Sequence, residues 1–456
     1  MSRSGYRRLI AISDPLLRGR HHLHIQISCL PRAVALLAPR ITELTASLAC
    51  AALLFVGFVE QASAQGQQPI KVGLLLTYVG PTAMFARYED KGARMLIEQV
   101  NKDGGINGRP IELVGYDTEG KPDRAGVLYR RLAQEDKVVA VVGPDSIFVL
   151  LGMSSIPSEV QVMSVAAPGL YELVQPQHRG YVVSAWAANT FSGTLVLGYL
   201  KDKFKANKIG MITTSDSIGE TVARTVKTMA AVFGMEVVET AAQPASDRDL
   251  LPSLRKLANA QPKIEALYVF GSGPFANIAM NQSELAGINV PIAYNGGNVI
   301  PEFIKEVSPE TGKRTFLASA RSAIAATLPK ADPYYDRVQK FGSDYRAKYN
   351  EAPALPAAVG YDMAFAVVDA LRAVGPDPEK LRDYIRSKQT FVGAQGAEFK
   401  RTPSYGYGTD ATELAVASIE NGQFVYSGYL KDSLQRLGVT KEALTDKMRE
   451  LKMIAE

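Results

Sequence analysis

Short apolar runs alternate with longer amphipathic stretches along the chain from residue 70 onward. The first apolar runs predict β-strands at Ile70–Leu76, Ile111–Tyr116, Val138–Val142 and Val162–Val165. The stretches between them predict helices, because apolar residues recur there at spacings of three and four. Two such sets are Ala93, Leu96, Ile97 and Val100, and Ala125, Leu128, Tyr129 and Leu132. This alternation is typical of a parallel sheet with helices on both faces.

The same alternation begins again after Trp186. Its predicted strands are Ile209–Thr213, Glu236–Glu239, Ala266–Phe270 and Pro291–Tyr294, and its predicted helices lie near 219–233, 249–259 and 275–286. After a strand at Phe316–Ser319 the pattern changes to long helices at Tyr334–Tyr349 and Val359–Val374. No long linker separates the two series, and 456 residues exceed what one core usually holds. We therefore expect two α/β lobes joined by short crossings.

The stretch Val138–Val149 is the first candidate for a ligand contact. Its buried strand is broken by Gly143-Pro144-Asp145-Ser146, and the apolar residues that follow start a predicted helix. A helix start at the carboxyl end of a parallel strand can hold an anion with its unpaired N–H groups. An ordinary strand-to-helix turn explains the stretch equally well, so its residues alone leave both interpretations open.

The amino-terminal segment has the parts of a secretory signal. Residues 1–64 carry arginines but no lysine, then an apolar run at Leu48–Val59 and the small residues Ala62-Ser63-Ala64. We therefore expect a signal peptide, residues 1–64, that is cleaved between Ala64 and Gln65, and a periplasmic mature protein. The apolar run is shorter than the roughly 20 residues that span a bilayer, which argues against a membrane anchor. The segment is long for a signal, which also fits a start codon assigned too early.

Composition excludes several classes of protein. Both cysteines, Cys29 and Cys50, and every histidine except His178 lie in residues 1–64. The predicted mature chain therefore has little material for a zinc site, a disulfide or a histidine-based triad. The net charge of +5 comes mostly from the arginines of the leader, so the remainder gives no indication of nucleic-acid binding. We expect no metal and no cofactor.

Two motifs and two acids suggest other activities only weakly. Phe270–Ala276 (FGSGPFA) matches the loose form of a dinucleotide fingerprint, but Pro274 and a missing acid after the next strand argue against a nucleotide. The segment Tyr405–Gly408 is more typical of a loop or crossing than of an aromatic nucleic-acid platform in a neutral secreted protein. Asp117 and Glu119 follow the second strand, where acids commonly cap helices, so we expect no enzyme activity.

Several segments together resemble one family. They are Val72–Ala93 (VGLLLTYVGPTAMFARYEDKGA), Asn101–Val114 (NKDGGINGRPIELV), Val141–Pro144 (VVGP) and Gln282–Ile288 (QSELAGI). They are similar to the periplasmic leucine/isoleucine/valine-type solute-binding proteins of ABC importers, and the similarity runs through Ile70–Tyr429. The resemblance implies an α/β type I periplasmic binding protein fold, with two doubly wound lobes joined by three hinge crossings and the solute held in the cleft between them.

The resemblance also implies where the lobes divide and which partners they have. The crossings should fall near 184–188, 317–321 and 397–403, so that lobe 1 comprises residues 65–185 and 321–398 and lobe 2 residues 186–320 and 399–456. The implied partners are a small-molecule ligand, bound by hinge closure, and an ABC permease in the inner membrane. The same fold can instead signal to a membrane kinase, and the sequence leaves that sensing role open. It indicates no nucleic-acid partner and no stable membrane insertion after signal cleavage.

The family's ligand positions are only partly kept in this chain. Its aromatic residue after the first strand is kept as Phe85, and the first of its two small polar residues is kept as Ser146. The positions that depart from the family are Ile147, Ala167-Pro168, Ile218 before Gly219, and Gly273. Of these, Ile147, Ile218 and Gly273 predict a roomier and more apolar site, to which Tyr78, Phe85 and Trp186, at the first crossing, add aromatic rings.

One departure concerns the ligand's charge. The family's amino-acid binders place a carboxylate near Tyr294–Val299, but here that segment has no acid and Asn298 is its candidate ligand contact. An unpaired buried ammonium group costs on the order of several kcal/mol, so an amino acid fits poorly unless another acid reaches the cleft. We therefore expect an aromatic or other carboxylic acid, or an amide, with its polar end on Ser146 and backbone N–H groups. The family default is a branched-chain amino acid.

Overall fold

A computed structural model describes residues 68–80, 83–169, 174–187, 189–387, 390–400, 406, 408 and 410–451. The predicted signal peptide with its cleavage site, and the aromatic residues Tyr405 and Tyr407, lie outside these described residues. Within the described part of the chain, no helix combines the length and the apolar character needed to cross a membrane.

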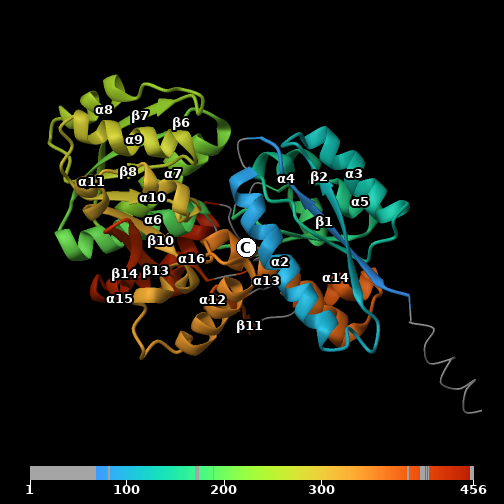
Figure 1. The fold of residues 1–456 in the computed structure, drawn as a ribbon. Helices are drawn as coiled ribbons and strands as arrows, with labels where there is room; N and C mark the ends of the chain where they lie inside the picture. The colour runs from blue at the N-terminus through green and yellow to red at the C-terminus, as the bar shows by residue number, and fades with distance from the viewer. Residues whose placement is uncertain are drawn as a thin grey trace, which may run out of the picture. The chain divides into compact units, whose positions relative to one another are not determined.

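The first sheet is built from parallel strands in the order β2-β1-β3-β4-β5. Figure 1 labels β1 and β2 among the helices of this sheet. Its strands are β1 (Ile70–Leu76), β2 (Ile111–Asp117), β3 (Ala140–Val142), β4 (Met163–Ala166) and β5 (Val182–Ser184). Successive residues of β1 point to opposite faces, since Leu74 and Leu76 join one hydrophobic cluster and Leu75 joins another. The sheet is therefore buried on both faces, as its unbroken apolar strands predict.

Helices cover both faces of the first sheet. On the face of Leu74 lie α2 (Ala83–Lys102) and α13 (Leu355–Val374), and α12 (Tyr335–Tyr349) packs beside α2. On the face of Leu75 lie α3 (Pro122–Gln134), α4 (Ile147–Met153) and α5 (Ile156–Val160). Helix α14 (Pro378–Ser387) follows α13 and packs against β4. We call this sheet with its helices the first lobe.

Helices α2 and α13 cross with their backbones in contact. A Cβ atom on Gly360 would lie 2.0 Å from the backbone oxygen of Glu89, and one on Gly92 would lie 1.9 Å from that of Ala357. Because no side chain fits at either position, the two glycines permit this close approach. The contact fixes the second turn of α2, and with it Glu89, against the first lobe.

The second sheet has the strand order β14-β13-β10-β9-β8-β6-β7. Its strands are β6 (Lys208–Thr214), β7 (Glu236–Gln243), β8 (Ala266–Val269), β9 (Ile292–Tyr294), β10 (Thr315–Ser319), β13 (Ala415–Glu420) and β14 (Gln423–Tyr429). Strands β6 to β10 pair in parallel, whereas β13 and β14 form an antiparallel hairpin at one edge. The sequence pattern did not predict this hairpin.

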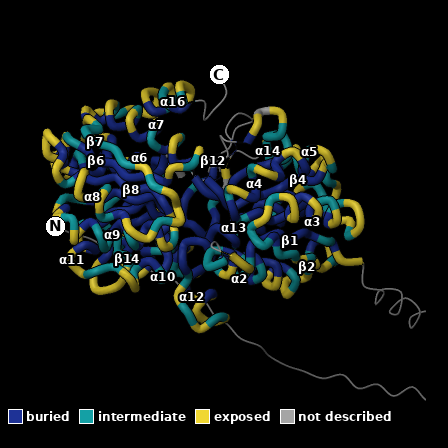
Figure 2. Tube along the Cα trace, turned by 90° about the horizontal axis from the view of Figure 1, so that it is seen from above, coloured by how far each residue is buried: buried dark blue, intermediate teal, exposed yellow. Residues whose placement is uncertain are grey.

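The second sheet and its helices form the second lobe. The helices are α6 (Asn189–Phe204), α7 (Ser217–Val232), α8 (Leu251–Ala258), α9 (Pro274–Leu285), α10 (Pro301–Lys305), α11 (Pro309–Lys313), α15 (Leu430–Arg436) and α16 (Lys441–Glu450). Helix α6 packs against β9 and β10, and α8 against β6 and β7. Buried residues follow the strands and the inner sides of the helices, while exposed residues follow the outer turns (Figure 2).

The predicted strands and long helices are confirmed with small shifts at their ends. Strand β3 begins at Ala140 rather than Val138, because the N–H of Val138 still bonds to Leu132 in α3. Helix α13 begins at Leu355 rather than Val359, with Pro356 in its first turn, where a missing N–H is tolerated. Two doubly wound α/β lobes are therefore the architecture of this chain.

The chain passes between the two sheets three times. It leaves β5 for α6, returns between β10 and α13, and leaves again between α14 and β13. The last passage contains a small antiparallel pair, β11 (Thr390–Val392) and β12 (Glu398–Lys400). The residue limits predicted for the two lobes stay a prediction.

Residues 394–396, between β11 and β12, bond to the first passage and to α13. The side-chain Nε2 of Gln395 donates to the backbone oxygen of Ala185 (3.0 Å) and to Asp362 Oδ2 (2.9 Å). The carboxylate of Asp362 also accepts the backbone N–H groups of Ala394 (2.6 Å) and Gln395 (3.1 Å). We call residues 394–396 the hinge loop.

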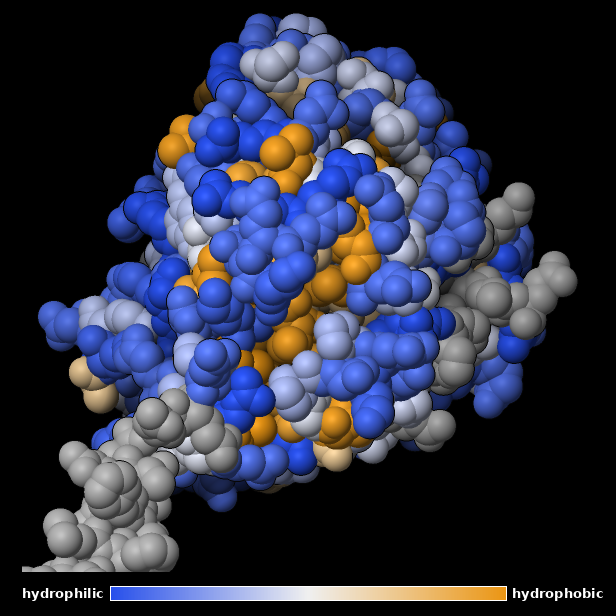
Figure 3. Space-filling model, turned by 90° about the vertical axis from the view of Figure 1, so that its right-hand side faces the viewer, coloured by the Kyte–Doolittle hydropathy of each residue, from blue (hydrophilic) through white to orange (hydrophobic). Residues whose placement is uncertain are grey.

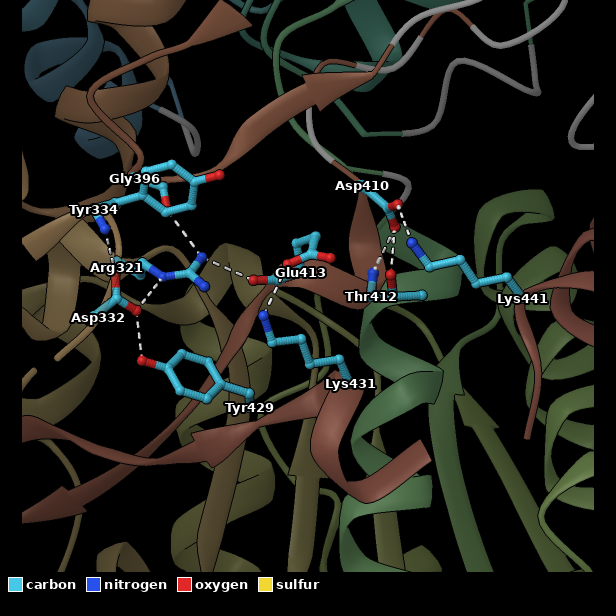
Figure 4. A network of polar contacts seen from close by, with 10 residues as sticks. All are labelled: Arg321, Asp332, Tyr334, Gly396, Asp410, Thr412, Glu413, Tyr429, Lys431 and Lys441. Atoms are coloured by element: carbon cyan, nitrogen blue, oxygen red, sulfur yellow. Dashed lines mark hydrogen bonds and ion pairs between the residues drawn. The ribbon is translucent and has the colours of Figure 1, made fainter. Parts of the chain in front are cut away.

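The hinge loop also bonds to Arg321, which follows β10 at the start of the second passage. Arg321 Nη1 donates to the backbone oxygens of Gly396 (2.8 Å) and Glu413 (2.9 Å), and its Nε donates to Asp332 Oδ2 (2.7 Å; Figure 4). Arg321 is 1% exposed. All three passages are therefore held together at the hinge loop.

Candidate functional site

Polar side chains gather at the carboxyl ends of three adjacent strands in the first sheet. Thr77 follows β1, Thr118 follows β2, and Asp145 follows β3. Thr77 Oγ1 donates to Asp145 Oδ1 (2.9 Å), so the hydrogen in its contact with Thr118 Oγ1 (2.8 Å) comes from Thr118. The carboxyl ends of neighbouring parallel strands meet at one edge, which is where ligands bind in open α/β sheets.

Glu89 reaches the same edge from the second turn of α2. It is 4% exposed, and in the described part of the chain both its Oε2 and the Oδ2 of Asp145 are buried without a hydrogen-bond partner. Burial, followed by repulsion from Asp145, raises the pKa of Glu89 well above its usual value. Burial raises the pKa of Asp145 to about 6, against the hydrogen bond from Thr77. We call Glu89 and Asp145 the acid pair, because the charge of each affects the other.

Ser146 lies between Asp145 and α4, as predicted. It is 5% exposed, and its hydroxyl does not cap the helix. Ile147 is the first residue of α4 and is half-buried. Ser146 thus directly follows Asp145 of the acid pair in the chain, and the contact of its hydroxyl with a ligand stays a prediction.

The backbone N–H groups expected to meet a ligand carboxylate are not free on the neighbouring loop. The N–H of Ala167 donates to the backbone oxygen of Pro144 (3.0 Å). Pro168 has no N–H, and its oxygen accepts from the hydroxyl of Ser184. Helix α4 has only seven residues, and the carboxylate of Asp145 stands next to its start. The negative charge of Asp145 therefore disfavours binding of an anion at this edge of the sheet.

Tyr78 and Phe85 flank this edge on the side of α2. The hydroxyl of Tyr78 donates to Asp90 Oδ1 (2.6 Å), and its N–H donates to Asp117 Oδ1 (2.9 Å). Phe85 lies in the first turn of α2, half-buried against the large hydrophobic cluster. The hydroxyl and the N–H of Tyr78 are thus both hydrogen-bonded within the first lobe. The predicted ligand contacts of Tyr78 and Phe85 are therefore contacts of their rings.

A second set of buried polar groups lies at the carboxyl end of the second sheet. Asn298 ends the short 3₁₀ helix η3 (Gly296–Asn298) after β9 and is 1% exposed. Its Nδ2 donates to the backbone oxygen of Gly271 (2.9 Å) and to Asn295 Oδ1 (3.1 Å). Its Oδ1 is buried without a partner among the described residues. Since both amide hydrogens are used, the unpaired group of Asn298 is an acceptor.

Two large aromatic side chains lie near this set. Trp186 is 4% exposed, and a Cβ atom on Gly296 would lie 3.1 Å from its ring. Tyr268, in β8, is fully buried; its hydroxyl has no partner in the described chain, and a Cβ atom on Gly193 would lie 2.8 Å from it. Sequence reasoning selected Trp186 but not Tyr268, because a tyrosine in a uniformly apolar strand gives no signal of its own.

The remaining predicted site residues of the second lobe, Ile218, Gly219 and Gly273, differ in their packing and hydrogen bonds. The N–H of Gly219 is taken by Asp216 Oδ1 (2.8 Å), which caps α7, and a Cβ atom there would lie 1.8 Å from the backbone oxygen of Thr214. Ile218 is 4% exposed and packs in the hydrophobic cluster. Gly273 precedes α9 at a φ of 58°, with nothing within 4 Å of a Cβ atom. Gly219 is thus required by packing, whereas Gly273 fits a roomier site.

One set of polar contacts joins the two lobes. Glu302, in α10, accepts a hydrogen bond from the hydroxyl of Tyr88 (3.3 Å) and lies 3.8 Å from Arg87, both in α2. The Oε2 of Glu302 is buried without a partner among the described residues. Glu302 is therefore an acid of the second lobe that reaches the first, although the segment Tyr294–Val299 before it has none.

A cavity of about 430 Å³ lies at the opposite end of the first sheet, at the amino ends of β3 and β4. Lys137, Val139, Tyr181 and Glu379 are among the residues that line it, and no predicted ligand residue does. Figure 3 shows one face of the molecule, on which apolar side chains gather in the middle among hydrophilic ones. The predicted ligand residues thus gather at the carboxyl ends of the sheets, away from this cavity.

The acid pair was not predicted from the sequence. Glu89 follows Ala86 by three residues and precedes Ala93 by four, so it lies on the buried face of α2. A charged residue on the apolar face of an amphipathic helix was the signal that could have identified it. Asp145 lies in the turn that the sequence pattern selected as a candidate ligand contact, but the residue predicted to bind there was Ser146.

Comparisons with known proteins agree with this architecture. Residues 69–423 match the periplasmic binding protein family. The leucine-, isoleucine-, valine-, threonine- and alanine-binding protein of Pseudomonas aeruginosa is 23% identical over 354 residues, which are 77% of this chain and 91% of that protein. The branched-chain amino acid transporter substrate-binding protein LivJ of Streptococcus pneumoniae, in complex with isoleucine, has a TM-score of 0.67 at 23% identity, covering 79% of this chain and 99% of that one.

A further solved structure has a different ligand. The solute-binding protein of an ABC transporter from R. palustris, in complex with benzoate, has a TM-score of 0.65 at 21% identity, covering 79% of this chain and 96% of that one. These relatives are substrate-binding proteins and not enzymes. The shared fold is the type I periplasmic binding protein fold, with the two doubly wound lobes described above. The chain therefore belongs to the periplasmic binding proteins of the branched-chain amino acid type.

Proposed function

We propose that this chain is the periplasmic solute-binding receptor of an ABC importer. It is secreted through a signal peptide cleaved after Ala64, and it captures a small organic solute between its lobes. A solute that contacts both lobes is bound fully only when they close, so it shifts the protein toward the closed state by its difference in affinity for the two states. The closed form then presents surfaces of both lobes to the permease.

The observation that carries this proposal is a pair of buried polar residues at the carboxyl ends of the two sheets: Asn298 keeps an oxygen that is unpartnered among the described residues, and the hydroxyl of Ser146 does not cap α4. Ser146 Oγ lies at the carboxyl end of the first sheet, and Asn298 Oδ1 lies at that of the second. A buried polar group without a partner costs free energy, which a ligand that bonds to it offsets. Ligands of open α/β sheets bind at this end of the strands.

The proposed ligand contacts are the residues selected from the sequence. Polar contacts come from Ser146 and Asn298, and ring contacts from Tyr78, Phe85 and Trp186. The walls of the site are formed by Ile147, Ala167, Pro168, Ile218, Gly219 and Gly273. The solute is a carboxylic acid or an amide, aromatic or otherwise, with a branched-chain amino acid as the family alternative.

Thermal unfolding of the purified protein with a panel of solutes tests this function. The panel comprises benzoate, benzamide, butyrate, butyramide, leucine and isoleucine. A ligand bound only by the native state raises the unfolding midpoint by mass action, so at least one compound should produce a saturable rise. A panel without any rise would contradict the proposal, and tight leucine binding without any from the acids and amides would exclude the acid-or-amide class.

Ser146→Ala is the variant that tests the proposed hydrogen bond between Ser146 and the ligand. Loss of its hydrogen bond to the ligand should weaken the affinity about ten-fold. The unfolding midpoint without ligand should stay nearly unchanged, because the hydroxyl does not cap α4. Ser154→Ala is the control, since its hydroxyl bonds to the backbone oxygen of Leu151 within the first lobe (3.0 Å).

A further inference from the structure

We infer that the acid pair, Glu89 and Asp145, sets the polarity of the solute: the group that the ligand places against the first lobe is an N–H donor, as in a primary amide or an amine, and not a carboxylate. This inference rests on the proposed function and narrows its solute class.

The first observation is that this edge already holds two carboxyl groups whose outer oxygens are unsatisfied. Glu89 Oε2 and Asp145 Oδ2 are both buried without partners among the described residues, and the only side-chain hydrogen bond to the pair comes from Thr77. A ligand carboxylate beside them would be a third acid in the same buried space. The negative charge that the pair carries would repel a ligand carboxylate where water is excluded, whereas an N–H group would bond to an unpaired carboxylate oxygen.

The second observation is that the loop after β4 offers no free backbone donor to an anion at Ala167 or Pro168. The N–H of Ala167 is already bonded to Pro144, and Pro168 has none. Ser146, which is 5% exposed and directly follows Asp145, can donate one hydrogen or accept, so it serves an amide as well as an acid. At Ala167 and Pro168 the loop after β4 therefore adds no backbone donor for an anion, and the hydroxyl of Ser146 suits either polarity.

The second lobe supports the same polarity independently. Asn298 uses both hydrogens of its Nδ2, on Gly271 and Asn295, and keeps an unpaired Oδ1. Reversing this amide would set its oxygen against the backbone oxygen of Gly271, so the network fixes the orientation. Asp145 Oδ2 in the first lobe and Asn298 Oδ1 in the second are thus both acceptors unpaired among the described residues, which together favour a solute with N–H groups.

Calorimetric titration of the purified protein with matched acid and amide pairs tests the inference. The pairs are benzoate with benzamide and butyrate with butyramide, and isoleucine is titrated as a zwitterion that carries an ammonium donor. We expect the amide of a pair to bind at least about ten-fold more tightly than its acid, because a hydrogen bond to a charged partner replaces a repulsion. Acids that bind as tightly as their amides would overturn the inference while leaving the proposed function intact.

Substitution of the pair gives the second arm of the test. Glu89→Gln and Asp145→Asn keep the shape of each side chain and supply amide hydrogens, so each should shift the acid-to-amide affinity ratio toward the acid by about ten-fold. For isoleucine each should weaken binding by a similar factor. Glu112→Gln, at an exposed position of β2, is the control and should leave every ratio unchanged.

The outcomes separate the two proposals. If one variant does not fold, the other still tests the pair, because the two acids come from different elements. Unchanged ratios in a folded variant would overturn the inference. If no compound binds the wild-type protein, the proposed function fails, and the inference fails with it.

Discussion

Arg321 Nη1 donates a 2.8 Å hydrogen bond to the backbone oxygen of Gly396, the residue next to Gln395, whose side chain holds the backbone of Ala185. Two consecutive residues of the hinge loop thus bond to the first passage and to the start of the second. A Cβ atom on Gly396, at a φ of 68°, would lie 2.4 Å from the side chain of Val338, so the loop is also tightly packed. Motion between the lobes must therefore occur around this fixed point rather than by separating the passages.

Arg321→Met should strongly destabilise the protein. It leaves Asp332 buried without its cation and removes the donor of two backbone oxygens, which costs about 3–5 kcal/mol in the free energy of unfolding. The rings of Tyr334 and Tyr429, at 5.2 and 5.1 Å from the guanidinium carbon, lose their cation as well. Chemical denaturation of wild-type and variant protein measures the difference.

Lys340→Met is the control for the charge. Its ion pair with Asp344 is exposed on α12, so its loss should cost less than about 1 kcal/mol. An equally small loss for Arg321→Met would show that the buried network does not hold the passages.

Asp362 makes the stability of the protein depend on pH. Burial raises its pKa from 3.8 to about 7 in the folded protein, against hydrogen bonds from the hinge loop. The folded state therefore binds this proton more tightly than the unfolded state, so the contribution to stability is full below pH 3.8 and is lost as the pH rises through 7. Glu89 and Asp145, with raised pKa values, act in the same direction.

Asp362→Asn should flatten this dependence. The variant should be less stable overall, because an amide cannot accept all the N–H groups that the carboxylate accepts, but it should lose less stability between pH 4 and 7 than wild type. Urea denaturation across this range measures both effects. Asp344→Asn, at an exposed position, should keep the wild-type slope; the same slope in Asp362→Asn would contradict the assignment.

Glu302→Lys should favour separation of the lobes. The new cation would repel Arg87 and could not accept the hydrogen bond from Tyr88. The lost contacts between the lobes are worth up to about 1 kcal/mol, so the ratio of open to closed protein should rise by up to about five-fold. Small-angle scattering of the ligand-free protein should give a larger radius of gyration. Glu310→Lys, whose ion pair with Lys313 lies within the second lobe, should give the wild-type radius.

Gly360→Ala should loosen the contact between α2 and α13. The added methyl group would lie 2.0 Å from the backbone oxygen of Glu89, so one helix must shift, at a cost of about 1–3 kcal/mol. The shift also moves Glu89 relative to Asp145. Gly180→Ala, where nothing lies within 4 Å of the new atom, should be nearly neutral; equal unfolding midpoints for the two variants would contradict this account.

Local patterning predicted the strands and helices well, because each of their signals lies within a few residues. The hairpin of β13 and β14 was not predicted. Its turn at Asn421-Gly422 has φ values of 50° and 70°, the conformation that this dipeptide favours. The Asn-Gly pair between alternating apolar residues could have predicted this hairpin.

The site was harder to predict, because its contacts join residues far apart in the sequence. Ser146 and Asn298 could be selected because they stand in segments where the resembled family places its ligand contacts. Glu89 meets Asp145 only because α2 packs on α13 and β1, and Arg321 meets Gly396 across 75 positions of the chain. Periodicity gives the buried face of each element, but it does not tell which buried charge will find which partner.

Trp186 offers the most direct test of ligand capture between the lobes. It is the single tryptophan of the chain, 4% exposed at the first passage and close to Gly296 of the second lobe. Titration of the purified protein with the acid, amide and amino-acid panel, followed by tryptophan emission, should give a saturable change with the solute that raises the unfolding midpoint. Unchanged emission at saturation with such a solute would contradict closure of the two lobes around it.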